Sequence, residues 1–149
     1  MTGVGTAQLS PRAHRIIEAL ERVNEGVHGA ARTAEVYDED VSYCDPMHAC
    51  RGKAALRAMT RRYIESARVF RYQIDRSSVV EGGDLLYFAF AGAFAGRVGP
   101  ELRVKGLTQL RLRGDLIVSH QDTFDVLAAM LGGIPIVGRV HRWLPRREA

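Results

Sequence analysis

Two acidic residues occupy strand positions that are normally apolar. Asp45 has the same alternation parity as Val41 and Tyr43, and Asp122 shares one face of a predicted strand with Phe124. If the apolar neighbours face the core, both carboxylates face it as well. Burial raises the pKa of a carboxyl group toward the range useful for proton transfer. Asp45 and Asp122 are therefore candidate catalytic acids or bases; the alternative is that each pairs with a buried arginine or caps backbone N–H groups.

Polar and aromatic side chains expected near these carboxylates form a second group. His120 lies on the face of Asp122, and Thr108 lies on the inward face of the preceding strand. A histidine on an apolar face also has a structural interpretation, as a hydrogen-bonded core residue. The full set of candidate supporting or ligand-binding residues is Tyr43, Thr108, His120, His48, Phe88, Phe90 and Tyr63.

Aromatic residues on a predicted middle strand could belong to a core or to a cavity wall. Phe88, Phe90 and Phe94 share one face, opposite Tyr87 and a row of alanines. If the phenylalanine face lines a pocket, its aromatic rings and the two acids describe an apolar cavity with a few polar groups. Such a cavity suits an apolar, oxygenated small molecule, but alternation alone leaves open which face lines it.

Cys44, His48 and Cys50 invite a metal interpretation, which their spacing does not favour. A zinc site needs four ligands, or three and a water molecule, and the sequence shows no second cluster to complete this one. Glycine-rich nucleotide motifs and the Gly-x-Ser-x-Gly motif are missing from the sequence. We therefore expect no metal and no cofactor.

Length and composition indicate one globular domain. The 149 residues are 46% hydrophobic and 26% charged, which favours a single domain over residues 1–149, with a flexible stretch at 1–9 and a helical tail at 126–149. The sequence shows no membrane-spanning apolar run and no signal-peptide pattern, so we expect a cytoplasmic protein. The net charge of +4 comes mostly from arginines interspersed with acids, and nucleic acid is not the expected partner.

The order of predicted elements is typical of an α+β fold. Ser10 and Pro11 are a helix-start signal, and Gly26 ends that helix. Later segments alternate with period two, which predicts long antiparallel strands with one covered face. The helices should pack on one face of a curved antiparallel sheet around one pocket. Expected helices cover 30–37, 53–67, 126–131 and 137–144, and expected strands cover 41–45, 69–80, 85–95, 102–113 and 116–124.

The last predicted strand carries the acid and the histidine. Its alternation would put one set of side chains on a single inward face: Leu116, Val118, His120, Asp122 and Phe124.

Three segments resemble the nuclear transport factor 2-like superfamily, which includes ketosteroid isomerases, limonene epoxide hydrolases and SnoaL-like polyketide cyclases. They span residues 37–46, 52–56 and 114–125. The resemblance implies a cone-shaped α+β fold, a single pocket, a hydrophobic small-molecule ligand and a homodimer formed through the exposed sheet face. The superfamily hosts many reactions, so the resemblance specifies the fold better than the chemistry.

Individual positions match different members of that superfamily. Asp45 matches the general base of the isomerases, but Thr108 stands where they have a protonated aspartate. Tyr43 resembles a water-positioning tyrosine of the epoxide hydrolases, and Asp122 resembles the acid that ends their last strand. The Arg-x-Asp pair of the hydrolases would fall on Phe90 and Gly92, which cannot replace it.

These observations predict a SnoaL-like, cofactor-independent acid-base enzyme acting on a polyketide, terpenoid or steroid-like molecule. Cyclisation, double-bond isomerisation and epoxide opening all need one proton removed and another delivered. The alternative is a non-catalytic module of the same fold that binds a lipophilic ligand or a protein.

Overall fold

The computed structural model describes residues 9–132, which form helices followed by a long-stranded sheet. The helix expected over 137–144 lies outside the described residues. The helical elements are α1 (Pro11–Glu21), η1 (Arg22–Glu25), α2 (Val27–Thr33), η2 (Ala34–Val36), α3 (Lys53–Ser66) and α4 (Val126–Gly132). The strands are β1 (Tyr37–Cys44), β2 (Ala49–Arg51), β3 (Ala67–Gly82), β4 (Leu85–Gly96), β5 (Leu102–Arg113) and β6 (Leu116–Phe124).

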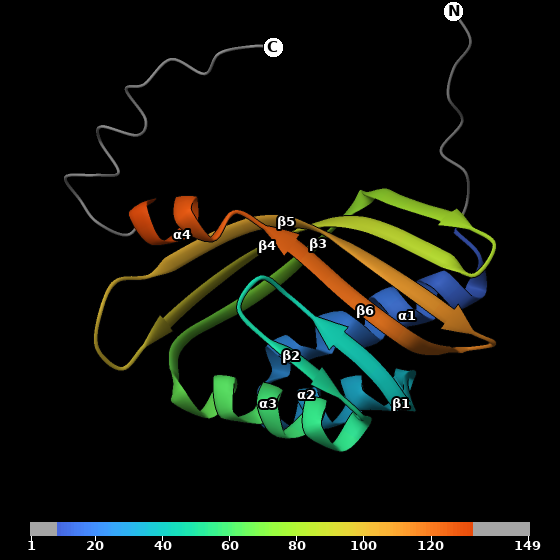
Figure 1. The fold of residues 1–149 in the computed structure, drawn as a ribbon, viewed down its shortest axis with the longest axis horizontal. Coiled ribbons are helices and arrows are strands. Elements are labelled where there is room, and N and C mark those ends of the chain that lie inside the picture. The colour runs from blue at the N-terminus through green and yellow to red at the C-terminus, as the bar shows by residue number, and fades with distance from the viewer. Residues whose placement is uncertain (1–8, 133–149) are drawn as a thin grey trace, which may run out of the picture.

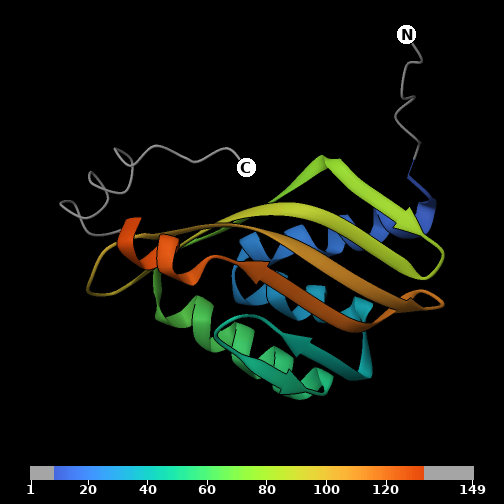
Figure 2. The same cartoon turned by 45° about the horizontal axis from the view of Figure 1, so that its top comes forward.

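Six strands form one curved sheet in the order β2-β1-β6-β5-β4-β3 (Figures 1 and 2). Neighbouring strands are antiparallel except β1 and β6, which pair in parallel. After the β1–β2 hairpin, the chain passes through α3 and forms β3 at the far edge of the sheet. It then returns through β4 and β5 to β6, which lies beside β1 and runs parallel to it. The expected α+β architecture is confirmed, with a mixed sheet in place of an entirely antiparallel one.

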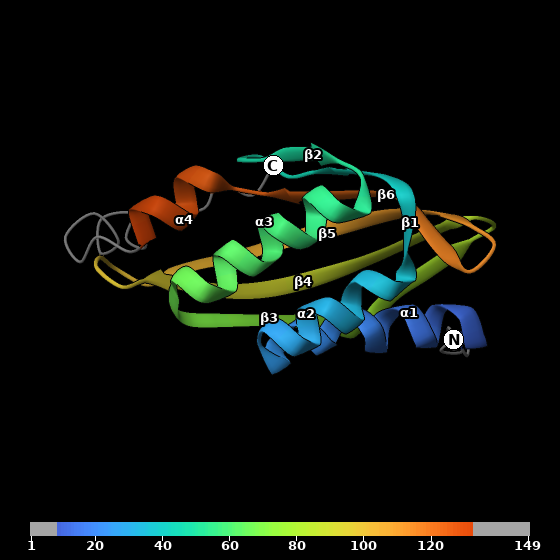
Figure 3. The ribbon, with the colours of Figure 1, turned by 90° about the horizontal axis from the view of Figure 1, so that it is seen from below.

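The helices α1, α2 and α3 lie across one face of the sheet (Figure 3). Helix α1 begins as expected, because the Ser10 side chain accepts a hydrogen bond from the Ala13 N–H and Pro11 follows as the first helical residue. Its fully buried Ile16 and Ile17 join a core that also contains buried residues of β4, β5 and β6. Among the described residues, no helix is long and apolar enough to cross a bilayer.

The second helix differs from the expected span of 30–37. It begins at Val27, after Gly26 at a φ of 80°, and it gives way to η2 at Ala34. Tyr37 is the first residue of β1 and pairs with Ile117 of β6. Local sequence favours helix here, but pairing with a neighbouring strand determines the backbone of Tyr37. This difference changes the site, because the Tyr37 side chain points inward.

A bulge interrupts the alternation of β6. The β5–β6 register shifts between the pairs Arg111–Ser119 and Leu112–Ile117. Consequently Ile117 is fully buried, whereas Leu116 and Val118 are half-buried. An inserted residue reverses which side chains face the core on either side of it. The expected inward face is therefore wrong for Leu116 and Val118.

Candidate active site

Two cavities lie between the helices and the sheet and share part of their walls. The inner cavity, about 170 Å³, extends toward α1 and α2, and the outer cavity, about 270 Å³, extends over β4 and β5 to α4. Both carboxylates predicted from the sequence lie where the two cavities meet. The residues that line both cavities are Tyr43, Asp45, Tyr63, Phe70, Tyr72 and Asp122.

The walls of the outer cavity are mainly apolar. Phe90 and Phe94 of β4 and Phe124 of β6 provide aromatic rings, and Ala129 and Met130 of α4 contribute at one end. Phe90 and Phe124 meet edge to face, with their ring centroids 6.5 Å apart. An apolar cavity with a few convergent polar groups is the usual form of a small-molecule site.

Asp122 of β6 is held by three side chains. Its Oδ1 accepts hydrogen bonds from the Thr108 hydroxyl at 2.5 Å and from His120 Nε2 at 2.9 Å. Its Oδ2 accepts a longer bond, 3.3 Å, from the Tyr43 hydroxyl. Burial raises the pKa of Asp122, but the charge of His120 and these hydrogen bonds outweigh it and leave that pKa below its usual value.

The lowered pKa corrects the expectation that burial makes Asp122 a weaker acid. The carboxyl is 11% exposed, and the donors around it stabilise its ionised form more than burial disfavours it. Asp122 is therefore a carboxylate at neutral pH and can act as a proton acceptor.

His120 connects Asp122 to a buried tyrosine. An ionised carboxylate can only accept, so His120 Nε2 carries the proton that bonds Asp122. Its Nδ1 is hydrogen-bonded to the Tyr37 hydroxyl at 2.7 Å. Burial, followed by the charges of nearby ionisable groups, raises the pKa of Tyr37, which keeps the phenol protonated. Tyr37 thus fixes the orientation of the imidazole ring behind Asp122.

Asp45 follows β1 and organises the turn before β2. Its Oδ1 accepts the backbone N–H groups of Met47 at 2.7 Å and His48 at 2.8 Å. The same oxygen is 3.2 Å from His48 Nδ1, and the other ring nitrogen of His48 is hydrogen-bonded to the Tyr63 hydroxyl. The structural alternative for Asp45, the capping of backbone N–H groups, therefore holds for Oδ1, while Oδ2 faces the site.

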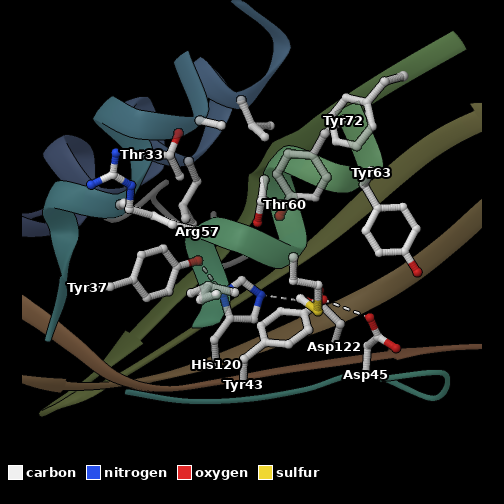
Figure 4. Close-up of a pocket in the computed structure, with 17 residues that line it drawn as sticks. Thr33, Tyr37, Tyr43, Asp45, Arg57, Thr60, Tyr63, Tyr72, His120 and Asp122 are labelled. Carbon is white, nitrogen blue, oxygen red and sulfur yellow. Dashed lines mark hydrogen bonds and ion pairs between the residues drawn. The ribbon is translucent and has the colours of Figure 1, made fainter. Parts of the chain in front are cut away.

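Tyr43 joins the two acids (Figure 4). Its hydroxyl donates to Asp45 Oδ2 at 2.9 Å and lies 3.3 Å from Asp122 Oδ2. Burial, and then the charges of Asp122 and Asp45, raise the pKa of Tyr43, so the hydroxyl keeps its proton. Because one O–H serves both carboxylates, Asp122 Oδ2 is the least satisfied carboxylate oxygen of the pair and can accept a proton or a hydrogen bond from a ligand.

The remaining predicted residues separate into two groups. His48, Tyr63 and Phe90 line the outer cavity, whereas Phe88 is 1% exposed in the core and lines neither cavity. Thr108 is buried against Asp122. Phe88 pairs with Thr108 across the sheet, but its side chain packs among the buried core residues and does not line either cavity.

Neither arginine pairing nor a metal cluster appears in the part of the chain that the structure describes. The ion pairs of Asp45 and Asp122 within residues 9–132 are with His48 and His120. Cys44 is exposed and Cys50 half-buried, and among these residues no group of three or more potential ligands gathers to hold a metal.

Sequence reasoning missed several residues that line the cavities, among them Tyr37, Tyr72 and Phe70. The expected helix over 30–37 ends at Tyr37 and gives no sign of the contact between Tyr37 and His120. Tyr72 lies in the expected strand over 69–80, whose alternation places its side chain inward but says nothing about its hydroxyl.

Comparison with known proteins identifies one domain family for this chain and several solved structures with a similar fold. The family model described as SnoaL-like domain matches residues 14–120. No curated protein sequence is significantly similar to the chain.

Three similar solved structures have sequence identities of 18% or less to this chain. At such low identity, the similarity shows a shared fold and nothing more. An M. tuberculosis LEH-like epoxide hydrolase has 18% identity and a TM-score of 0.70, covering 88% of this chain and 96% of that one. A putative SnoaL-like polyketide cyclase from Shewanella putrefaciens has 15% identity and a TM-score of 0.68, covering 86% and 99%. A hypothetical protein with a ketosteroid isomerase-like protein fold from Catenulispora acidiphila has 18% identity and a TM-score of 0.67, covering 84% of this chain and 93% of that one.

Proposed function

The chain belongs to the SnoaL-like domain family, and from that premise we propose that it is a cofactor-independent acid-base enzyme acting on a hydrophobic small molecule. The observation that carries this proposal is the pair of carboxylates joined by Tyr43 at the junction of two largely apolar cavities. The substrate class is a polyketide, terpenoid or steroid-like compound that bears oxygen.

In this proposal Asp122 is the proton acceptor. Its Oδ2 has one long hydrogen bond, whereas Oδ1 is held by Thr108 and His120. Those two donors fix the plane of the carboxylate, so Oδ2 presents a lone pair to the cavity without reorganisation.

Asp45 and Tyr43 form the second half of the proposed machinery. A proton taken by Asp122 can return to a different atom of the substrate, while the Tyr43 hydroxyl orients either a water molecule or the substrate oxygen between the acids. Such a sequence fits isomerisation, cyclisation and epoxide opening alike. The Arg-x-Asp pair of the hydrolases is replaced by Phe90 and Gly92, which favours the first two reactions.

The test compares two generic proton-transfer reactions. One is deuterium incorporation next to the carbonyl of 1-tetralone in D₂O, followed by mass spectrometry; the other is the ring opening of styrene oxide. Asp122→Asn keeps the shape and the acceptor at Oδ1 but removes the base, so the rate should fall by about 100-fold or more. Asp45→Asn should also slow the reaction, because a neutral amide is a weaker acceptor for the Tyr43 hydroxyl that orients the reacting oxygen.

Asp40→Asn is the matched control. This carboxylate is exposed on the same strand as Tyr43, and its removal should leave the rate unchanged. If Asp122→Asn reacts as fast as the wild-type protein, Asp122 is not the base and the proposal is wrong.

A second candidate function is non-catalytic binding of a lipophilic ligand. The observation that favours it is the use of Asp45 Oδ1 in the turn before β2, which gives this acid a structural role independent of chemistry. Saturable binding of 1-tetralone without deuterium exchange would support this alternative.

A further inference from the structure

Tyr72 of β3 carries a buried polar atom with nothing to bind. Its ring lines both cavities, and within residues 9–132 its hydroxyl is buried and makes no hydrogen bond. The Thr108 hydroxyl is near enough to stabilise the phenolate form, but the two groups do not reach hydrogen-bonding geometry. A buried hydroxyl without a partner costs free energy that a phenylalanine ring would not.

The backbone of Tyr72 is held from outside the sheet. The Asn24 side-chain amide donates to the Tyr72 carbonyl oxygen at 2.7 Å, and the Asn24 Oδ1 accepts from the Tyr72 N–H at 2.8 Å. The Asn24 side chain therefore holds both backbone polar groups of Tyr72, the N–H and the carbonyl oxygen, at the edge of the sheet. This clamp limits movement of the strand at the position from which the ring enters the cavity.

The aromatic ring of Tyr72 is packed as well. It lies against Phe90, with ring centroids 5.5 Å apart and the planes at 36°. Figure 4 shows the ring reaching into the space between β3 and the groups of β6, on the opposite side of the cavity from Tyr37 and His120. The clamp and the packing position the hydroxyl before any ligand arrives, which reduces the entropy lost on binding.

Tyr72 can act only as a neutral hydroxyl. Burial, and then the negative charge of Asp122, raise the pKa of Tyr72, so the phenol keeps its proton at physiological pH. A protonated phenol whose nearest acceptors are out of reach is a free donor. It complements an acceptor oxygen on a molecule that enters the cavity.

We propose that the Tyr72 hydroxyl donates a hydrogen bond to a carbonyl oxygen of the bound ligand, whose hydrocarbon part lies against Phe90 and the outer cavity. This inference rests on the proposed function only in taking the joined cavities as the ligand site. The inference identifies the ligand class as an apolar ketone or a related carbonyl compound. Tyr72 is then the residue that makes the protein bind such a ketone more tightly than a hydrocarbon of the same shape.

The test compares 1-tetralone with tetralin, which has the same bicyclic frame without the oxygen. Dissociation constants are measured by titration followed by NMR for the wild-type protein and for Tyr72→Phe. The wild-type protein should prefer the ketone. The substitution should weaken ketone binding by roughly tenfold, the usual effect of one neutral hydrogen bond, and leave tetralin binding equal or tighter.

Tyr87→Phe is the matched control, because Tyr87 is 39% exposed on the other face of β4. It should change neither dissociation constant. The melting temperature of Tyr72→Phe should not fall, since the hydroxyl makes no bond in the folded protein, and this separates a binding effect from loss of structure.

Three outcomes overturn the inference: wild-type affinity of Tyr72→Phe for the ketone, an equal loss of affinity for ketone and hydrocarbon, or failure of both probes to bind the wild-type protein. The result is independent of catalysis. If the ketone preference depends on Tyr72 but no deuterium exchange occurs, the proposed enzyme activity alone is wrong. If exchange occurs and Tyr72→Phe binds normally, the inference about Tyr72 alone is wrong.

Discussion

Replacing Tyr37 with phenylalanine should destabilise the protein, although it removes a single oxygen atom. Tyr37 is 5% exposed, and its hydroxyl bonds His120 Nδ1 at 2.7 Å behind Asp122. The substitution leaves that ring nitrogen buried without a partner, which costs about 1–3 kcal/mol. For a chain of this length, about 2 kcal/mol corresponds to a fall of roughly 4–8 °C in melting temperature.

The assay is thermal unfolding at pH 7, followed by circular dichroism, with Tyr72→Phe as the partner variant. The two substitutions remove the same atom from the same residue type, and they differ in whether that atom has a hydrogen-bond partner. Tyr72→Phe should keep the free energy of unfolding within about 0.5 kcal/mol of the wild-type value or raise it. Equal melting temperatures for the two variants would refute the role assigned to the Tyr37–His120 contact.

Two further predictions concern the pH dependence of stability at Asp122 and the steric effect of adding a side chain at Gly106. The pKa of Asp122 is lower in the folded protein than its usual value of 3.8, so its contribution to stability is complete above that value and is lost as the pH falls through the folded pKa. In urea unfolding between pH 7 and pH 2, the stability difference between the wild-type protein and Asp122→Asn should shrink below about pH 4, and a constant difference would contradict this. Gly106→Ala should lower the free energy of unfolding by about 1–3 kcal/mol, because a Cβ there would lie 2.3 Å from the Thr123 carbonyl oxygen and 2.9 Å from the Phe90 ring. Gly82→Ala, with no atom within 4 Å of its Cβ, is the control and should be nearly neutral in the same urea experiment.

Periodicity predicted the elements well where local signals and tertiary structure agree. The Ser10–Pro11 helix start, the strand over 85–95 and the strand over 116–124 all appear close to their expected bounds. It failed at Tyr37, where pairing with β6 overrides a helical tendency, and at Leu116, where a bulge shifts the parity. Both failures depend on a partner strand that is distant in the sequence.

For the candidate site, the sequence predicts the two inward carboxylates but not the hydrogen-bond partners that surround them. Strand parity placed Asp45 and Asp122 inward, and the structure brings them to a shared tyrosine. Parity could not predict that Asp45 Oδ1 accepts backbone N–H groups of a turn, or that donors from three strands lower the pKa of Asp122. It also grouped Phe88 with Phe90, although the position along β4 separates a core residue from a cavity residue.

The Asn24 clamp on Tyr72 also bears on how this protein behaves at high concentration. β3 is the last strand of the sheet, so its outer side offers backbone groups to which a strand of another molecule could add. Asn24 occupies both groups at Tyr72, and the irregular register between Asp75 and Val80 distorts the same edge further along. At the opposite edge, β2 is three residues long. The same contact that positions the Tyr72 ring thus occupies two backbone groups at this edge to which a strand of another molecule could otherwise add.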